Sequence, residues 1–407
     1  MTTIVAAIFI IVYLGMILGG LPFLQLDRTG VALLGAIAIV ALGELTPEQA
    51  ALSIHLPTLL LLFSFMVISA QMRLGGFYTW ATMRVASLPL APGRLLAAAM
   101  LMAAALSAVF SNDIVCLAVA PVLTEACLRR RLDPVPFLLG LACAANIGSA
   151  LTLIGNPQNM LIGEVLRLSF SGYLAVAIVP VMLGLAAAWL LIAWQSRGRW
   201  QSTAEPAGEP ERREDGAGLD RWQTGKGLAV AGALMAVFLF TSWPREVAAL
   251  TGAGVLLMNR QLHSNKMLGL VDWELLVLFI GLFVVNHAIA HTGLTASGIA
   301  WLAATGLPLA EPAMLFGTSF VLSNVVSNVP AVMLLLPAAT EAFSGPMLAL
   351  VSTFAGNLLL VGSIANIIVV DAARRHGVAI DWRRHARTGI PVTLATLAIT
   401  AACFAFR

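Results

Sequence analysis

The chain has 407 residues, of which 59% are hydrophobic and 11% charged, and its formal net charge is +3. Soluble domains usually carry about 25% charged residues. The composition therefore excludes a soluble globular protein and predicts an all-α polytopic membrane protein. The four cysteines lie within apolar runs and none has CxxC spacing, so neither a disulfide framework nor a zinc ribbon is expected.

Apolar runs long enough to cross a bilayer recur along the chain. In order, they cover residues 4–23, 29–46, 56–74, 134–165, 172–194, 227–243, 246–260, 271–292, 346–371 and 388–406. Two further runs, 96–128 and 309–343, are interrupted by polar Ser-Asn pairs. Because irregular backbone survives at membrane depth only where protein or water lines it, each of these two runs is predicted to form a re-entrant hairpin.

The two halves of the chain match each other. Matching residues are 217 positions apart before the hairpin, 216 at its tip and 207 after it: Gly35 and Gly252, Gly76 and Gly293, Asn112 and Asn328, Gly155 and Gly362, and Asn159 and Asn366. We therefore predict two repeats, each of five transmembrane helices and one hairpin, about ten spans in all. Because five is an odd number, the second repeat is expected to be inverted.

The expected domains follow from this duplication. Repeat one covers residues 1–195 and repeat two residues 227–407, and the polar stretch 196–226 is predicted to be a linker. Repeat one is divided into scaffold spans 4–74, hairpin 96–128, broken helix 134–165 and span 172–194. Repeat two is divided into scaffold spans 227–292, hairpin 309–343, broken helix 346–371 and span 388–406.

The basic residues decide the expected orientation. With the N-terminus outside, the loops predicted on the cytoplasmic side hold all of the 23 Lys and Arg residues except Arg167, Arg245 and Arg407. Because cytoplasmic loops are enriched in Lys and Arg, both termini are expected outside a bacterial-type plasma (inner) membrane and the linker 196–226 inside. The first hairpin then enters from the cytoplasm and the second from outside.

The tips of the two predicted hairpins carry the most unusual residues. Both read Ser-Asn, eight residues, Pro, three residues, Glu, and they begin at Ser111 and Ser327. A helix that starts there leaves its first N–H groups unpaired, and Asn112 and Asn328 are expected to cap the two starts. Two such starts, one from each side, would direct positive dipole ends at the midplane, which suits an anion or an oxy-acid rich in lone pairs.

A second polar element follows each hairpin. The stretches 146–159 and 357–366 place Gly, and in the first case Pro, among amides and hydroxyls. Such stretches predict unwound helix segments whose oxygens can hold a cation such as sodium. The predicted substrate-binding residues are Ser111, Asn112, Asp113, Asn159, Ser327, Asn328, Ser363 and Asn366. The predicted coupling-ion residues are Asp113, Asn112, Ser149, Gly155, Asn156, Asn328 and Gly362.

Asp113 breaks the symmetry of the tips, since Val329 occupies the matching position. It is the only acidic residue at a hairpin tip, and an ionised carboxylate repels an anionic substrate unless a proton or sodium neutralises it. We therefore predict that Asp113 is the residue that couples transport to H⁺ or Na⁺. No cofactor and no metal centre are expected, because His287 and His291 lack a third ligand.

These motifs resemble the ion transporter superfamily over nearly the whole chain. The two Ser-Asn pairs are similar to the Ser-Asn-Thr tips of the divalent anion:sodium symporters, but Asp113 and Val329 stand at the two threonine positions. The Asn-Asp within 110–121 and the Asn-Val-Pro at 328–330 more closely resemble the arsenical pump membrane protein (ArsB-type) family. The Ile-Gly-Asn-Pro-Gln-Asn at 154–159 is similar to generic anion permeases.

The resemblance implies an elevator mechanism. A transport domain, formed by both hairpins and the two spans after each, would slide against a scaffold formed by the first three spans of each repeat. The symporter relatives are homodimers, and the arsenite-permease branch implies association with an arsenical pump ATPase. The partners expected otherwise are the lipid bilayer and a small-molecule or ion substrate, with no nucleic acid.

The function favoured by the sequence is secondary active transport of a small inorganic oxyanion or oxy-acid, with proton-coupled efflux of arsenite or antimonite preferred. Asp113 decides this preference, because neutral arsenous acid tolerates a nearby carboxylate better than a dianion does. The alternatives are a sodium-coupled symporter of di- or tricarboxylates, sulfate or another divalent anion, and a sodium/proton antiporter. An enzyme would need a nucleophile–base pair or a metal triad at depth, and the sequence contains no such motif. No role is assigned to Cys116, Glu125 or Glu341.

Overall fold

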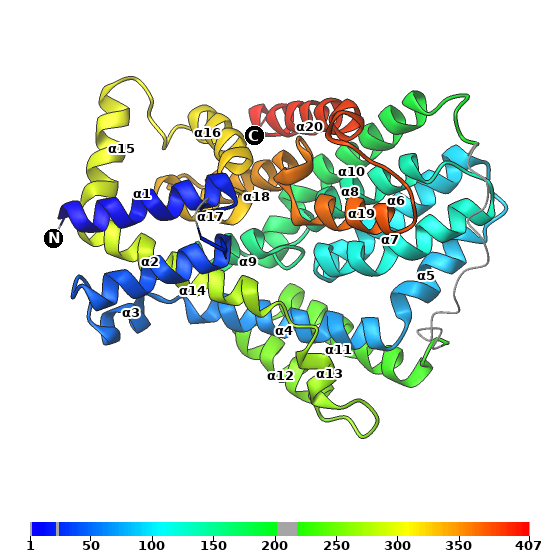
Figure 1. The fold of residues 1–407 in the computed structure, drawn as a ribbon, viewed down its shortest axis with the longest axis horizontal. Coiled ribbons are helices and arrows are strands. Elements are labelled where there is room, and N and C mark those ends of the chain that lie inside the picture. Colours follow the sequence, from blue (N-terminus) through cyan, green and yellow to red (C-terminus); the bar gives the residue numbers. More distant parts are fainter. Residues whose placement is uncertain (1, 22–23, 202–217, 407) are drawn as a thin grey trace.

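The computed structural model describes residues 2–21, 24–201 and 218–406. Within these ranges the chain is predominantly α-helical, and the only strands are β1 (Gly20–Leu21) and β2 (Leu26–Asp27), which form an antiparallel pair (Figure 1). The expected all-α class is confirmed.

The first half of the chain contains α1 (Thr2–Leu18), α2 (Arg28–Ala41), α3 (Pro47–Ser53), α4 (Leu56–Leu74), α5 (Phe77–Ala86), α6 (Pro92–Val109), α7 (Asn112–Arg129), α8 (Pro134–Ser149), α9 (Pro157–Val165) and α10 (Phe170–Gln195). The second half contains α11 (Arg221–Phe240), α12 (Arg245–Leu257), α13 (Ser264–Leu268), α14 (Trp273–His291), α15 (Leu294–Ala304), α16 (Pro312–Val325), α17 (Asn328–Leu335), α18 (Ser344–Ala355), α19 (Ile364–Arg375) and α20 (Trp382–Ala405). Two short 3₁₀ helices, η1 (Leu336–Ala338) and η2 (Leu360–Gly362), complete it.

Among the described residues, six helices are long and apolar enough to cross a membrane: α4, α6, α10, α11, α14 and α20. Other apolar helices are shorter, and α2 and α12 have 14 and 13 residues, against the 20 or so that a straight span needs. The predicted spans 29–46 and 246–260 are too long at their C-terminal ends, because α2 ends at Ala41 and α12 at Leu257. The chain is a multi-pass membrane protein.

Helix starts recur at the offsets found in the sequence. The starts of α2, α3, α4 and α5 return 217 residues later as those of α12, α13, α14 and α15. The start of α7 returns 216 residues later in α17, and that of α9 returns 207 residues later in α19. The order of the elements is thus duplicated, while the inversion of one repeat across the membrane stays a prediction.

The sequence did not anticipate helices α5 and α15. Each begins directly after a glycine with a left-handed backbone, Gly76 at φ 73° and Gly293 at φ 76°. Such a conformation strains residues that carry a side chain, so both glycines allow the chain to turn sharply as it leaves α4 and α14. Tyr78 of α5 is buried against Phe110, whereas no residue of α15 is fully buried.

The extensively packed helix pairs fall into two groups. In the first, α4 packs on α12, and α2 packs on α14. In the second, α6 packs on α8, α10 on α20, and α7 on α19. Figure 1 shows α4, α11, α12 and α14 in the lower part of the molecule and α10, α18 and α20 in the upper part. Four of these pairings, all except that of α6 with α8, join the first half of the chain to the second, so the two halves interlock.

Both predicted hairpin regions are helix–break–helix units. Helix α6 ends before Phe110 and Ser111, and α7 then begins at Asn112. Helix α16 ends before Val326 and Ser327, and α17 begins at Asn328. The second arms are unequal, because α7 continues through its internal proline to Arg129, whereas α17 ends at Leu335 and gives way to η1.

The linker expected at 196–226 needs correction at its C-terminal end. Residues 202–217 lie outside the described residues, but α11 already begins at Arg221. Asp220 caps this helix, because its carboxylate accepts hydrogen bonds from the backbone N–H groups of Trp222 and Gln223 at 3.0 Å each. Repeat two therefore begins its first helix six residues earlier than the predicted start at 227.

Ser327 provides a testable consequence of the second break. Its φ of 79° and ψ of 160° lie in a region that essentially only glycine adopts, and such strain costs about 1–3 kcal/mol. We expect Ser327→Gly to raise the apparent melting temperature of the purified protein by about 2–4 °C, measured by thermal unfolding in detergent. Ser111→Gly is the matched control: Ser111 has φ −56°, so glycine there should lower the melting temperature, and equal shifts in the two variants would contradict the argument.

Candidate functional site

Asn146 is the centre of a buried hydrogen-bond network that joins both halves of the chain. Its Oδ1 accepts from Asn112 Nδ2 at 3.3 Å and from Ser363 Oγ at 3.0 Å. Its Nδ2 donates to Asn357 Oδ1 at 2.9 Å and to Asn366 Oδ1 at 3.3 Å. One side chain of α8 thus fixes the first hairpin tip and the broken helix of the second repeat in place.

A related pattern surrounds Thr353, which lies 207 positions after Asn146 in α18. Thr353 Oγ1 donates to Asn159 Oδ1 at 3.3 Å and accepts from Asn156 Nδ2 at 3.2 Å. Asn159 and Asn156 lie 207 positions before Asn366 and Ser363, so these two bonds correspond to those that Asn146 makes with Asn366 and Ser363. Each half of the chain therefore holds the broken helix of the other half by the same pair of contacts.

The breaks in both helices are closed by equivalent amides. Asn159 Nδ2 donates to the carbonyl of Thr152 at 3.1 Å, and Asn366 Nδ2 donates to the carbonyl of Leu359 at 3.1 Å. Carbonyls next to a helix end have no helical donor, and these amides replace it. Tyr173 also accepts a bond from Asn159 at 3.1 Å.

The residues predicted around the first break are engaged within the protein. Asn156 caps α9, because its Oδ1 accepts from the N–H of Asn159 at 2.9 Å. Ser149 Oγ accepts from Asn156 Nδ2 at 3.0 Å. A side chain at Gly155 would lie 2.2 Å from the carbonyl oxygen of Ser149, so only glycine fits where this backbone folds back on itself.

The asparagines at the tips are not helix caps, contrary to the expectation. The cap positions are Ser111 and Ser327, neither of which makes a side-chain cap bond, and Asn112 and Asn328 are the first helical residues. At the first tip the Nδ2 of Asn112 donates to Asn146, and its Oδ1, the atom that a cap would use, has no hydrogen-bond partner within the described residues. The helix starts at the two tips, and that of α19 at Ser363, therefore have N–H groups without side-chain acceptors.

Three amide oxygens around the tips are buried and have no hydrogen-bond partner in the described part of the chain: Oδ1 of Asn112, Asn324 and Asn328. Asn324 lies one turn before the second tip, and its Oδ1 is 3.4 Å from the position that a Cβ would take at Gly362. Buried acceptors are normally satisfied by protein, water or an ion. These oxygens are therefore available to a cation or to hydroxyl donors of a ligand.

Asp113 lies in the first turn of α7 and is partly exposed. Within the described residues its carboxylate makes no hydrogen bond and no ion pair. A carboxylate without a partner at this depth is available for proton or cation exchange.

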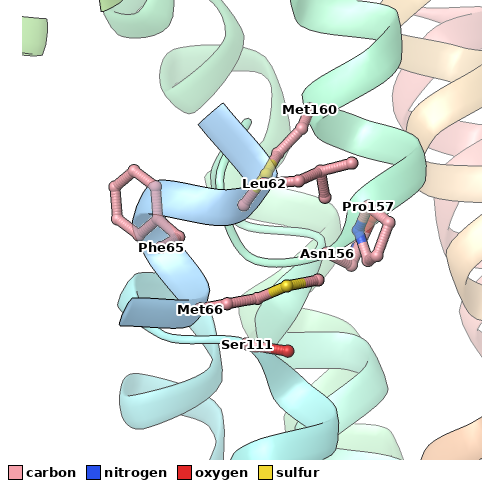
Figure 2. Close-up of a pocket in the computed structure, with 7 residues that line it drawn as sticks. All are labelled: Leu62, Phe65, Met66, Ser111, Asn156, Pro157 and Met160. Atoms are coloured by element: carbon pink, nitrogen blue, oxygen red, sulfur yellow. The ribbon is translucent and has the colours of Figure 1, made fainter. Parts of the chain in front are cut away.

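A small pocket lies beside the first tip (Figure 2). Leu62, Phe65 and Met66 of α4 line it from one group of helices. Ser111, just before α7, and the start of α9, with Asn156, Pro157 and Met160, line the rest of it. Its volume of about 10 Å³ is close to the space of one water molecule, and none of its lining residues is charged.

The structure thus brings together most, but not all, of the predicted site residues. Asn112, Ser363 and Asn366 bond to Asn146, while Ser149, Asn156 and Asn159 belong to the cluster around Thr353. The hydroxyl of Ser149 joins the two clusters into one network, because it donates to the backbone carbonyl of Asn146 at 2.8 Å. Asp113, Ser327 and Asn328 make no bond to it, and Gly155 and Gly362 contribute close backbone packing. Sequence reasoning assigned no role to Thr353 or Asn324. The offset of 207 from Asn146 would have identified Thr353. The additional Ser-Asn pair at 323–324, just before the tip pair at 327–328, would have identified Asn324.

The fully buried side chains of the described residues include many amides and hydroxyls but no Lys, Arg, Asp or Glu. Polar groups at the centre of an apolar helical protein, beside two helix breaks, are typical of membrane transporters. Fold and site together define a multi-pass membrane transporter. The chain belongs to the citrate transporter family, whose model matches residues 7–355, and this membership confirms the resemblance to the ion transporter superfamily.

Similar proteins agree with this class. The silicon efflux transporter LSI3 of Oryza sativa subsp. japonica is 30% identical over 93% of this chain and 92% of its own. The putative transporter arsB of Dictyostelium discoideum is 23% identical over 92% of this chain and 87% of its own. The crystal structure of the YdaH transporter of Alcanivorax borkumensis has a TM-score of 0.57 at 13% identity and covers 100% of this chain and 98% of its own.

Proposed function

We propose that the protein is a secondary active transporter of a small neutral oxy-acid, with arsenous acid, or an analogue such as silicic acid, exported in exchange for protons. The observation that carries this proposal is the neutrality of the centre. Amides and hydroxyls line it, and no fully buried Lys or Arg of the described residues is present to receive a carboxylate. A hydroxy acid without charge needs only hydrogen-bond partners, which the unpaired oxygens of Asn112, Asn324 and Asn328 supply.

The names of two relatives support the same substrate class. One is called a silicon efflux transporter and another a putative transporter arsB. Silicic and arsenous acids share a small size, several hydroxyl groups and neutrality near pH 7. The pocket at the first tip is likewise lined by no charged residue.

The coupling ion is proposed to be a proton carried by Asp113. This carboxylate has no partner in the described residues and lies one residue after Asn112, whose Oδ1 is unpaired. An acidic group in such surroundings can be neutral in one conformation and ionised in the other.

A sodium-coupled carboxylate transporter is the second candidate. The family description names citrate, and the three unpaired amide oxygens are ligands that sodium accepts. A bound cation would offset part of the charge of a carboxylate. A third candidate, sodium/proton antiport, would use Asp113 and the same oxygens without any oxy-acid.

Counterflow in proteoliposomes discriminates these candidates. Purified protein is reconstituted, and the exchange of internal arsenite, antimonite, silicic acid, citrate, succinate or sulfate against labelled external substrate is measured with and without pH and sodium gradients. We expect saturable exchange of the neutral acids that a pH gradient drives. Saturable exchange of citrate or succinate, but of no neutral acid, would overturn the proposal in favour of the symporter.

We further propose that both termini lie outside a bacterial inner membrane and that the linker is cytoplasmic. We also propose that the two groups of helices move against each other as an elevator and that the protein forms a homodimer, as the resemblance to the symporters implies. If arsenite is the substrate, an arsenical pump ATPase is a proposed partner. Single cysteines introduced near residues 3, 200 and 405 and labelled by an impermeant maleimide in intact cells test the orientation, which predicts labelling at 3 and 405 only.

A further inference from the structure

An ion pair links α12, which packs on α4, to α9, which follows the first helix break. Arg245, the first residue of α12, places its Nε 3.0 Å from Oε1 of Glu164 near the end of α9. Its Nη2 also donates to the carbonyl of Gly163 at 2.9 Å. Both charged side chains are largely buried, with 15% and 9% of their surfaces exposed. Helix α12 belongs to the group around α4, and α9 directly follows the break that carries the site.

The duplication places a second pair of charges at the equivalent positions. Arg28, the first residue of α2, lies 217 positions before Arg245, and Asp371 in α19 lies 207 positions after Glu164. These are the offsets at which the starts of α2 and α12, and of α9 and α19, correspond. The positive-inside orientation puts this second pair on the cytoplasmic side and the first pair outside.

The second pair is not formed in this conformation. The Nε of Arg28 is buried and has no partner within the described part of the chain. Asp371 binds Arg374 at 3.3 Å and Arg375 at 2.7 Å, both in its own helix and both strongly exposed. Exposed pairs of this kind contribute little, so Asp371 can exchange its partner readily. Figure 1 shows α2 and α19 well apart.

We propose that Glu164–Arg245 and Arg28–Asp371 are alternating ionic latches. The first holds the conformation seen here, and the second forms when α9 and α19 have moved to the opposite end of their travel against α2 and α12. The latches rest on the proposed alternating transport. They make the two end states similar in energy, because each state forms one cross-group ion pair and leaves the other open. When the two end states have similar free energies, the helices that carry the site move in both directions at comparable rates.

Cysteine cross-linking tests this arrangement. Arg28→Cys and Asp371→Cys are combined in the full chain with its four native cysteines replaced by alanine, and a protease site is inserted between residues 205 and 212. After reaction with a short bifunctional maleimide in membranes, protease treatment separates the halves unless a cross-link joins them on the gel. Adding Glu164→Gln is expected to raise the cross-linking rate about five- to tenfold, because the state seen here loses its latch.

The matched control is Glu125→Gln, which removes an exposed carboxylate that pairs with Arg129 within a single helix at 2.6 Å. This variant should leave the rate unchanged, and Arg245→Gln should reproduce the effect of Glu164→Gln. No cross-link in any variant, or equal acceleration by Glu125→Gln, would overturn the latches. Cross-linking reports the conformation rather than the substrate. A response to Glu164→Gln therefore supports the latches even if counterflow contradicts the neutral oxy-acid.

Discussion

Asp113→Asn is expected to abolish ion-driven transport and to leave the protein folded. The carboxylate of Asp113 makes no hydrogen bond or ion pair in the described part of the chain, so the amide replaces no structural contact. The substitution removes the single acidic residue that the two tips contain, since Val329 stands at the equivalent position of the second tip. A neutral amide can neither gain nor lose the coupling proton, and we expect uptake driven by a pH gradient to fall by about tenfold or more.

The measurement compares gradient-driven uptake with counterflow in the same proteoliposomes. Counterflow exchanges substrate without net movement of the coupling ion, so Asp113→Asn should retain it. Glu125→Gln serves as the control, because it removes a carboxylate of the same helix that is exposed and paired with Arg129. If Asp113→Asn kept the full response to a pH gradient or a sodium gradient, Asp113 would not be the coupling residue.

The helix breaks could be predicted from the sequence because polar residues at membrane depth have few structural solutions. The Ser-Asn pairs at 111–112 and 327–328 fall where α7 and α17 begin, and the constant offsets anticipated the repeated helix starts. Helices α5 and α15 were missed because they are 10 and 11 residues long. A run of that length, too short to span a bilayer, is not distinguished by its composition from a loop between spans.

The site was predictable residue by residue but not contact by contact. Each asparagine on the broken helices is conspicuous in an apolar chain, yet the sequence does not say which amide meets which. Thr353 illustrates the limit: a threonine in an apolar helix usually bonds its own backbone, whereas here its hydroxyl contacts Asn156, Gln158 and Asn159. Asn112 was expected to cap a helix, and tertiary contact with Asn146 overrides that local preference.

Asn146→Ala is expected to destabilise the protein strongly and to abolish transport. The side chain of Asn146 makes four bonds, to Asn112, Asn357, Ser363 and Asn366. Alanine leaves these groups buried without their partner, and each unsatisfied group costs about 1–3 kcal/mol. Partial relaxation and water entry reduce the total, so we expect a loss of about 3–5 kcal/mol. Thermal unfolding in detergent measures it, and counterflow measures the transport.

Ser352→Ala is the matched control for this loss. Ser352 is fully buried in α18 beside Thr353, but its hydroxyl bonds only to the carbonyl of Ala349 in its own helix, at 3.3 Å. Its removal should cost about 1 kcal/mol or less. Thr353→Ala should fall between the two, because Thr353 makes three bonds to the first repeat. An Asn146→Ala protein as stable as Ser352→Ala would show that the network does not hold the two broken helices together.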